Sequence, residues 1–465
     1  MSTGVFDVGA LRRAVAAQVI GPGEPGYDEA RAVWNGAIDR RPSAVVRPAD
    51  TAEVAEAVAA IRASGADLTV RGGGHNYAGH AVADGAVLLD LGRLDQVLVD
   101  PLRQRARCGG GATWAELDGM AGAQGLAVTG GFISDTGIGG LTLGGGFGWL
   151  TPLFGMSCDN LVEAEVVTAE GHVVAASAQE NPDLFWALRG GGGNFGIVTG
   201  FEFVLHAFGP MVQVALLWWP PEEAVAALVE GQAVLMDLPA RHCGTINAIS
   251  GPPAPFVPRH WQGKPGFVVG IAGDGSAFDL ADAVAPLRAL TPTPAWELVA
   301  EMPYPALQQM FDGTAPWGLW SYEKSLYLDR IDAAVAEVMV EQYPRSRAPL
   351  SVMPTLPLCG HYSRLADADT AFGGSRAPGL IVNISTSSPD PATFAAERQW
   401  VREFWDELRP FARDDRTYVN FLGDGNTAQV AAAYGAKYDR LRAVKGRWDP
   451  TNVFRHNANI SPALP

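Results

Sequence analysis

Residues 44–76 change from a strand-like to a helix-like pattern of hydrophobic positions and back to a strand-like one. A short apolar run, typical of a buried strand, is followed by Val54, Val58 and Ile61 at the spacing of one helix face. A second strand-like run and a loop of glycines come next. The pattern therefore predicts a short βαβ-like unit that ends at His75.

Polar residues at the ends of the apolar runs indicate where the first helices begin and end. Asp50 and Glu53 suit the start of the first predicted helix, and Gly65 suits its C-terminal cap. Thr113 and Glu116 have the capping-box spacing and predict the start of another helix.

The remaining periodic segments mix both kinds of element. Apolar, β-branched runs predict strands and 3.6-residue periods predict helices. The predicted strands are 86–94, 95–100 and 196–205, and the predicted helices are 181–189 and 431–448, the latter stopped by Asp449 and Pro450. Together these elements predict an α+β protein.

The composition changes between about Pro210 and Pro410. There the chain has proline-rich breaks and several tryptophans, and far fewer glycine clusters than the segment before it. We therefore expect a substrate-binding domain over 209–414, inserted into a domain formed by 1–208 and 415–465. The active site is expected at the junction of the two domains.

Charge and length exclude several classes of protein. The chain has 465 residues, 48% of them hydrophobic, and a formal net charge of -16. This charge makes nucleic acid and anionic membranes poor partners. The N-terminal segment is a poor secretory signal and no apolar run reaches membrane-spanning length, so we expect a cytoplasmic protein.

The cysteines form neither a disulfide framework nor a metal site. They show no CxxC pairing and no zinc spacing, so no metal is expected. The cysteines are Cys108, Cys158, Cys243 and Cys359. Alone, Cys158 has the features of a small buried hydrophobe.

Glycine-rich segments supply the candidate cofactor site. The loop from Arg71 to Asn76 offers successive backbone N–H groups that suit a pyrophosphate, although His75 at its end is also a plausible turn residue. The glycines of 191–196 match G-x-G-x-x-G, but a predicted helix precedes them and a predicted strand follows. That order argues against a Rossmann site and a nicotinamide-dependent dehydrogenase.

Several motifs occur together and in order along almost the whole chain. They are RPADTAEV, VRGGGHNYAG, TGIGGLTLGGGFGWL, FGMSCDN, NPDLFWALRGGGGNFGIVT and VKGRWDPTNVF. With them the chain resembles the berberine bridge enzyme-like FAD-linked oxidases, within the vanillyl-alcohol oxidase and p-cresol methylhydroxylase superfamily. The resemblance implies a two-domain fold and one FAD bonded covalently to both His75 and Cys158.

The same resemblance implies the remaining site residues. Tyr418 matches the family's active-site base, and strand alternation would put Asn420 on the same face. Tyr322 and Lys324 are expected to border the substrate cavity, where Lys324 would lower the pKa of a phenol; a surface lysine beside a structural tyrosine is the alternative. The other residues expected to contact FAD are Val70, Arg71, Gly72, Gly73, Gly74, Asn76, Gly139, Gly140, Leu141, Thr142, Gly144, Gly148, Ile197, Val198 and Asn457.

The implied reaction is oxidation of a hydroxyl group to a carbonyl. The expected substrate is a sugar, glycoside or secondary metabolite, and molecular oxygen would reoxidise FAD with release of hydrogen peroxide. Amine oxidation, oxidative ring closure and a flavoprotein dehydrogenase are alternatives within the enzyme class. A binding protein that retains flavin without turnover is an alternative outside it. The sequence leaves the oligomeric state open.

Overall fold

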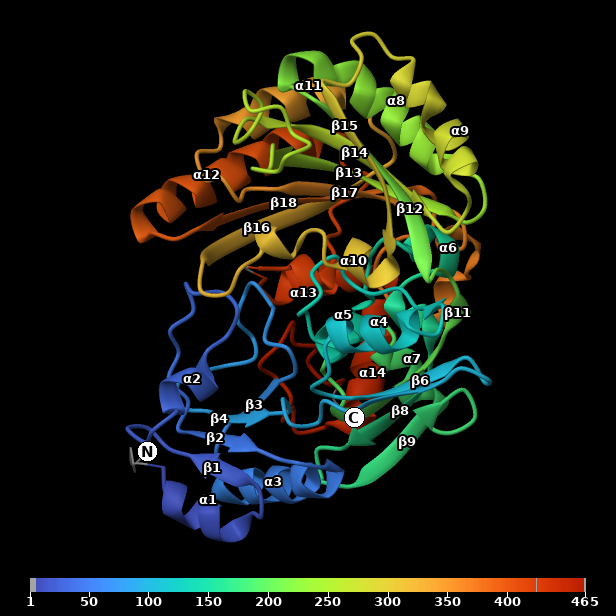
Figure 1. The fold of residues 1–465 in the computed structure, drawn as a ribbon. Helices are drawn as coiled ribbons and strands as arrows, with labels where there is room; N and C mark the ends of the chain where they lie inside the picture. The colour runs from blue at the N-terminus through green and yellow to red at the C-terminus, as the bar shows by residue number, and fades with distance from the viewer. Residues whose placement is uncertain (1–5, 424, 464–465) are drawn as a thin grey trace.

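The protein is an α+β molecule with two parts stacked on each other (Figure 1). The computed structural model describes residues 6–423 and 425–463. The lower part in Figure 1 contains the N-terminal segments and the C-terminal tail, and the upper part is built on one large sheet. Within the described residues, no helix has both the length and the apolar character of a transmembrane helix.

The predicted βαβ-like unit is present in the first sheet. Strands β2 and β3 both run parallel to β4, which lies between them, and β1 completes the sheet on the other side of β2. Asp50 caps the intervening helix at Glu53 N–H (2.9 Å), and Gly65 ends it with φ +73°. The elements of this region are α1 (Val8–Ala14), β1 (Gln18–Ile20), α2 (Tyr27–Arg31), β2 (Ala44–Arg47), α3 (Thr51–Ser64), β3 (Leu68–Arg71) and β4 (Val87–Asp90).

An antiparallel sheet of five strands in the order β5-β6-β10-β8-β9 packs beside the first. The capping box that precedes α4 is formed, with Thr113 N–H donating to Glu116 Oε2 (2.7 Å). The elements are β5 (Val97–Asp100), β6 (Arg105–Gly109), α4 (Trp114–Gly122), β8 (Leu161–Val167), β9 (Val173–Ser177) and β10 (Ile197–Val204); β7 (Leu126–Ala127) and β11 (His206–Ala207) pair separately.

The glycine-rich segments are not simple loops. Residues 138–144 form the short helix α5 (Ile138–Gly144), and α6 (Thr151–Phe154) follows soon after. Helix α7 (Pro182–Leu188) precedes the glycines of 191–196 and β10 follows them. The predicted helix–loop–strand order is therefore confirmed, and it is the reverse of a Rossmann dinucleotide motif.

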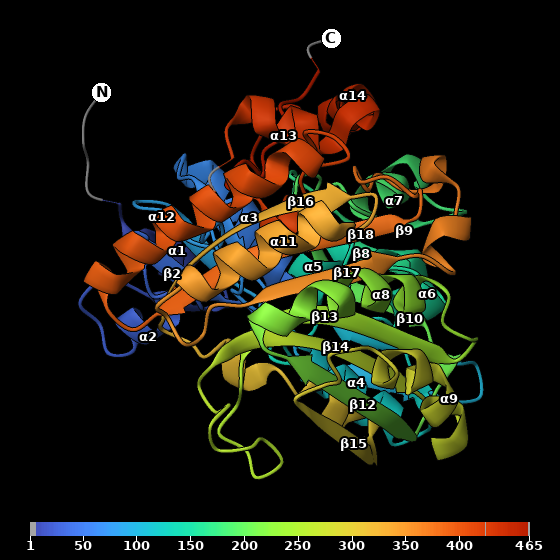
Figure 2. The same cartoon turned by 90° about the horizontal axis from the view of Figure 1, so that it is seen from above.

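The upper part is an antiparallel seven-stranded sheet in the order β15-β12-β14-β13-β17-β18-β16. Helices α8, α9, α11 and α12 cover its outer face, and the other face is turned toward the lower part (Figures 1 and 2). The elements are β12 (Met211–Trp219), α8 (Ala224–Met236), β13 (His242–Ser250), β14 (Pro265–Gly273), α9 (Ala277–Arg288), β15 (Trp296–Pro303), α10 (Tyr304–Gln308), β16 (Trp320–Leu328), α11 (Ala333–Gln342), β17 (Met353–Leu358), β18 (Gly379–Ser388) and α12 (Pro391–Leu408).

The C-terminal tail packs back on the first part, but its predicted helix is broken. Gly435, with φ +52°, separates α13 (Thr427–Tyr434) from α14 (Tyr438–Trp448). Buried Lys445 on α14 donates to Asn194 O (2.7 Å) and pairs with Asp449 (2.7 Å). These contacts fix the tail against the glycine segment that precedes β10.

Candidate active site

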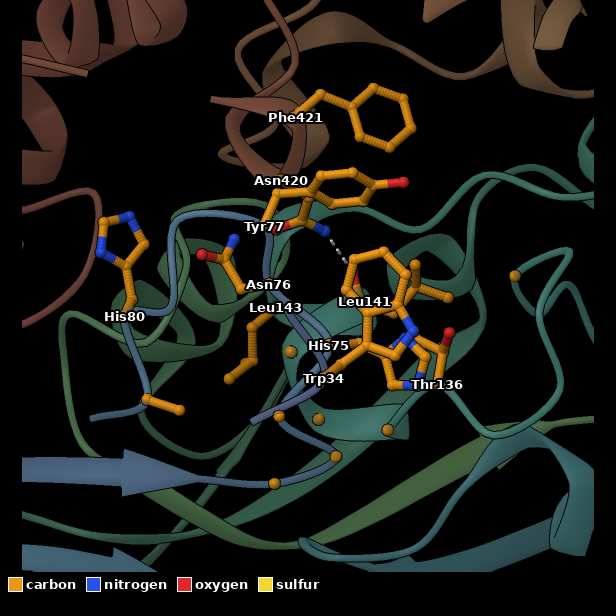
Figure 3. A pocket seen from close by; sticks show the side chains of 18 of the residues that line it. Trp34, His75, Asn76, Tyr77, His80, Thr136, Leu141, Leu143, Asn420 and Phe421 are labelled. Carbon is orange, nitrogen blue, oxygen red and sulfur yellow. Dashed lines mark hydrogen bonds between the residues drawn. The ribbon is translucent and has the colours of Figure 1, made fainter. Parts of the chain in front are cut away.

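A cavity of about 420 Å³ lies where the two parts of the molecule meet. Its lower wall comes from the loop at 72–77, helix α5, residues 192–198 and the tail at 454–458. Its upper wall comes from strands β13, β16, β17 and β18. Figure 3 shows side chains from both the N-terminal segment and the tail gathered around it.

Among the described residues, eleven glycines line the lower wall and leave the backbone bare at those positions. A Cβ at Gly73 would lie 2.3 Å from the N atom of Gly137, so the two loops touch and tolerate no side chain there. At Gly140 and Gly193, by contrast, a Cβ would meet no protein atom within 4 Å and would enter the cavity. Such a cradle brings N–H groups directly to a bound ligand, as an elongated dinucleotide requires.

Most of the residues expected to contact FAD line this cavity. They are Val70, Gly72, Gly73, Gly74, His75, Asn76, Gly139, Gly140, Leu141, Ile197, Val198 and Asn457. Tyr418 and Asn420 line it as well. Most of the residues predicted from the sequence thus lie in the lower wall, but many other residues of that wall were not predicted.

Four of the expected glycine-loop residues lie behind the cavity wall. The Arg71 guanidinium turns away to pair with Asp90 (2.8 Å), and Thr142 is fully buried. Gly144 packs on the amide of Asn420, and Gly148 packs on the carbonyl of Gly130. None of the four borders the cavity, so the structure does not support the predicted contact of Arg71, Thr142, Gly144 and Gly148 with the cofactor, which stays a prediction.

His75 lies in the wall between two tryptophans. The Trp34 ring stacks on it at 5.4 Å and 21°, and the Trp317 ring meets it edge-on at 5.5 Å. His75 Nε2 lies 2.9 Å from Asp135 Oδ1, and Trp317 Nε1 donates to Asp135 Oδ2 (2.6 Å). Burial acts to raise the pKa of Asp135, but His75 and Trp317 outweigh it and hold that pKa below its usual value. The ring is held at Nε2, which leaves Nδ1 for other chemistry.

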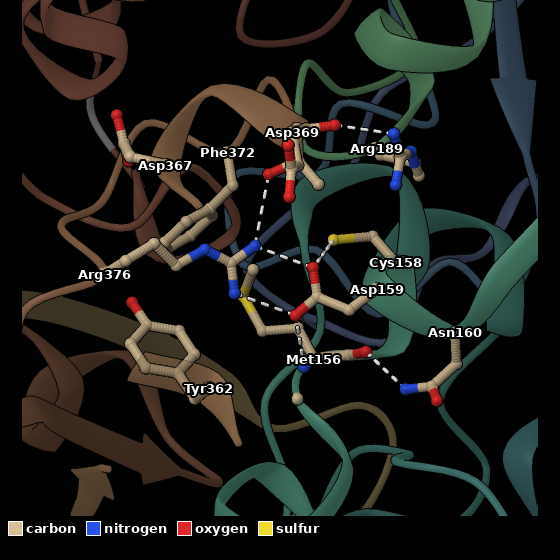
Figure 4. Close-up of polar contacts among 12 residues, drawn as sticks. Met156, Cys158, Asp159, Asn160, Arg189, Tyr362, Asp367, Asp369, Phe372 and Arg376 are labelled. Atoms are coloured by element: carbon tan, nitrogen blue, oxygen red, sulfur yellow. Dashed lines mark hydrogen bonds and ion pairs between the residues drawn. The ribbon is translucent and has the colours of Figure 1, made fainter. Parts of the chain in front are cut away.

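Cys158 is not part of the cavity wall, so the structure does not support the predicted bond to the cofactor, which stays a prediction. The side chain is fully buried, its N–H donates to Gly145 O (2.8 Å), and its Sγ lies 3.8 Å from Asp159 Oδ1 (Figure 4). Arg376 holds the Asp159 carboxylate with two contacts of 2.7 and 2.8 Å. Burial, reinforced by Asp159, raises the pKa of the Cys158 thiol well above its usual value. The nucleophilic thiolate is therefore disfavoured.

Tyr418 reaches the cavity from the tail. Its Oη accepts hydrogen bonds from Gly146 N–H and from the Asn420 side-chain amide, both at 2.8 Å. Burial raises the pKa of Tyr418 well above its usual value, and these two donors offset it only in part. Tyr418 precedes the 3₁₀ turn Val419–Phe421, so the predicted strand alternation is wrong, although Asn420 still reaches Tyr418. The oxygen is surrounded by donors, which suits negative charge on it.

Tyr322 and Lys324 lie on the opposite face of β16 from the cavity. Tyr322 packs in the core under helix α12, and Lys324 Nζ lies 3.9 Å from the centre of the Trp405 ring on that helix. Neither lines the cavity, so the structure does not support the expected substrate contacts, which stay predictions. The residue between them, Glu323, faces the cavity instead. The alternation of side chains along a strand places Glu323 on the opposite face from Tyr322 and Lys324. The sequence did not reveal which of the two faces points to the cavity.

Comparison with known proteins defines the family. The FAD binding domain family matches residues 42–177, and the Berberine and berberine like family matches residues 417–461. (R)-6-hydroxynicotine oxidase of Paenarthrobacter nicotinovorans is 31% identical over 464 residues, which is 97% of each chain. The chain belongs to the berberine bridge enzyme-like family. It is an FAD-dependent oxidoreductase.

Solved structures of this fold superpose on the entire chain. The crystal structure of 6-hydroxy-D-nicotine oxidase from Arthrobacter nicotinovorans has a TM-score of 0.85 at 26% identity, with 100% of both chains covered. A xylooligosaccharide oxidase from Myceliophthora thermophila has a TM-score of 0.84 at 24% identity, covering 99% of this chain and 100% of that one. The latter likeness shows the fold. The family's two matched segments contain the glycine loop with His75 and the tail with Tyr418, which meet at the cavity.

Proposed function

We propose that this protein is an oxidase that removes a hydride from a substrate carbon bearing a hydroxyl or amine group. The resemblance favours a sugar, glycoside or secondary metabolite whose hydroxyl becomes a carbonyl. Dioxygen would be the final electron acceptor, with hydrogen peroxide as its product. The observation that carries the proposal is the Tyr418 hydroxyl, which lies in the same cavity wall as His75 and receives two donors.

The residues of the chain have separate roles in this proposal. Bound FAD would supply the hydride acceptor. Tyr418 would take the proton from the substrate oxygen or nitrogen, and Gly146 N–H and Asn420 would stabilise the phenolate that does so. The apolar side chains of the upper wall would exclude water from the reacting carbon.

We propose a single covalent link to FAD, at His75. The imidazole borders the cavity and is fixed at Nε2 beside Asp135, which leaves Nδ1 as the free nucleophile. Cys158 has no part in this proposal because its thiol lies against Asp159 and outside the cavity. One link still retains the cofactor through every turnover.

Oxygen consumption and peroxide release test the oxidase proposal. Purified protein is mixed in air with a panel of sugars, aromatic alcohols and amines, and peroxide is measured against oxygen uptake. We expect equal amounts of both with at least one compound, as is consistent with the oxidase name of its 31%-identical relative. Reduced flavin that persists in air would identify a dehydrogenase. Flavin that no compound reduces would identify a binding protein.

A cytoplasmic location, a small-molecule substrate and dioxygen fit the acidic chain, whose formal net charge is -16.

A further inference from the structure

One carboxyl group faces the cavity from the upper wall. Glu323 is 1% exposed, and Asn383 Nδ2 donates to its Oε2 at 2.8 Å. Its other oxygen, Oε1, has no hydrogen-bond partner among the described residues. A buried carboxyl oxygen without a donor is costly, and a bound ligand is one way to satisfy it.

Glu323 belongs to a polar patch on two neighbouring strands. Strands β16 and β18 pair so that Glu323 lies opposite Ser385. Asn383 and Ser387, two residues to either side of Ser385 on β18, lie with it on the cavity face. Asn383 Oδ1, and Nδ2 of Asn247 on β13, also lack partners within the described chain. Acceptors and a donor therefore converge on the same part of the cavity.

The rest of the upper wall is apolar. Its side chains include Phe311, Leu350, Val352, Leu356 and Ile381. A wall of this kind packs against an aromatic or aliphatic body and offers few partners for the many hydroxyl groups of a sugar.

The charged side chains that line the cavity are also of one sign. Among the described residues that line it, Glu323 is the one carboxylate, and none is a lysine or arginine. Tyr77 and Tyr418 are the titratable groups that interact electrostatically with Glu323, and burial raises the pKa of both. The histidines of the wall are His75, His80 and His456. An anionic ligand would find no fixed positive side chain here, whereas a cation would find a carboxylate.

We propose that Glu323 binds the ammonium group of a cationic amine substrate, whose apolar body packs against the upper wall. This inference rests on the oxidase function proposed above and names its substrate class. One ammonium N–H would donate to Glu323 Oε1, and Tyr418 would accept another proton as the hydride leaves the adjacent carbon. The product is an iminium, which water hydrolyses to a carbonyl compound and an amine.

The ion pair predicts a particular pH dependence of amine affinity. Burial raises the pKa of Glu323 to about 8, while the Asn383 amide lowers it in part. Below that pH the empty site holds a neutral carboxyl group, so amine affinity should fall by up to about tenfold per pH unit. An alkylamine loses its own charge near pH 10, as lysine does. Amine binding should therefore be tightest between about pH 8 and 10.

The test compares amines with alcohols of the same skeleton. The probes are phenethylamine, N-methylphenethylamine and tryptamine against phenethyl alcohol and tryptophol, added without oxygen to the FAD-loaded protein. Binding is measured from the flavin spectrum, and the rate of flavin reduction is measured by rapid mixing. The variant is Glu323→Gln, which keeps an oxygen for the Asn383 amide.

A matched control variant is Asp118→Asn. Asp118 is 2% exposed, accepts a hydrogen bond from the Gln308 amide (3.1 Å), and has its pKa raised by burial to about 7. It lies outside the cavity wall. The two substitutions are therefore alike in burial and chemistry and differ in position.

We expect the wild-type protein to bind amines at least about tenfold more tightly than the matching alcohols at pH 8.5. Glu323→Gln should weaken amine binding by about 10- to 100-fold, remove its pH dependence and leave alcohol binding unchanged. Asp118→Asn should change neither.

Two binding results would overturn the inference: amines that bind wild-type protein no more tightly than alcohols, or amine binding that survives Glu323→Gln. If alcohols then reduce the flavin, the oxidase proposal stands without its amine. If amines bind through Glu323 but no amine reduces the flavin, Glu323 is an ammonium site but the amine is not the oxidase substrate, and the inference fails while the oxidase proposal stands.

Discussion

Burial sets the protonation state of the two titratable side chains at the centre of the account. Tyr418 and Glu323 lie in the cavity wall with exposures of 1% each, and burial raises the pKa of both groups. Each group therefore stays neutral to a higher pH than usual. The Tyr418 oxygen accepts a hydrogen bond from Gly146 N–H, and Glu323 accepts one from Asn383 while its Oε1 has no partner among the described residues. The site is therefore arranged to hold charge when a substrate is present.

A stability measurement tests the burial of Glu323. The pKa of this carboxyl group is about 8 in the folded protein, against a usual value of 4.5. Between these values the unfolded chain binds fewer protons, so Glu323 costs stability as pH rises from 4.5 to 8. Glu323→Gln should stabilise the protein by about 1–3 kcal/mol at pH 8.5 and change little at pH 4.5. An equal shift in melting temperature at both pH values would contradict this.

A second residue-scale prediction concerns the covalent link. After acid precipitation, wild-type protein and Cys158→Ala should both retain yellow colour and the added mass of one FAD. His75→Ala should release its flavin to the supernatant, because it removes the imidazole that borders the cavity. Covalent flavin that persists in His75→Ala and is lost only when Cys158 is changed as well would restore the double link that the resemblance implied.

At the scale of elements, the site depends on backbone that carries no side chains. Helix α5 and the glycines of 191–196 bring main-chain atoms to the cavity wall, and packing behind them is tight. At Gly140 the only space available to a Cβ is the cavity itself. Glycine is needed there for the ligand and not for the local fold.

Two alanine substitutions separate these effects. Gly140→Ala should reduce FAD content severalfold with a normal circular dichroism spectrum, because its Cβ enters the cavity. Gly119→Ala on helix α4 also meets no atom within 4 Å but is exposed to solvent. It should keep full FAD content and gain about 0.5–1 kcal/mol of helix stability. Equal flavin loss in both variants would show that the cradle is not specific.

Local signals along the chain predicted the early elements well. Asp50, Gly65 and Thr113 occupy the caps that their sequence context indicated. The break at Gly435 was missed because a glycine inside a helical period is compatible with a continuous helix. The sequence did not identify Glu323 as a cavity residue. Alternation places Tyr322 and Glu323 on opposite faces of β16, but only the packing of helix α12 determines which face the helix covers.

At the scale of the whole molecule, the two parts are joined around the cavity. Asp159 of the lower part pairs with Arg376 of the upper part at 2.7 Å, with both side chains at most 5% exposed. On another side, Trp34 Nε1 donates to Ala315 O (2.8 Å) and Gly318 N–H donates to Trp34 O (3.0 Å). The cavity walls are held in register by these contacts between distant segments.

The Asp159–Arg376 pair should be important for stability. Arg376→Met would leave the Asp159 carboxylate buried without its partner, at a cost of about 3–5 kcal/mol. We expect a lower melting temperature, with much of the loss recovered in Asp159→Asn/Arg376→Met. An unchanged melting temperature in the single variant would contradict a buried pair.

The most direct test of the central claim is the rate of anaerobic flavin reduction in Tyr418→Phe. Tyr343→Phe is the control, since Tyr343 is equally buried and donates to Ser351 O (2.9 Å) away from the cavity. We expect full flavin content in both variants and a reduction rate lowered by about 10²–10⁴ in Tyr418→Phe alone. A Tyr418→Phe rate equal to that of wild type would contradict the assignment of Tyr418 as the proton acceptor.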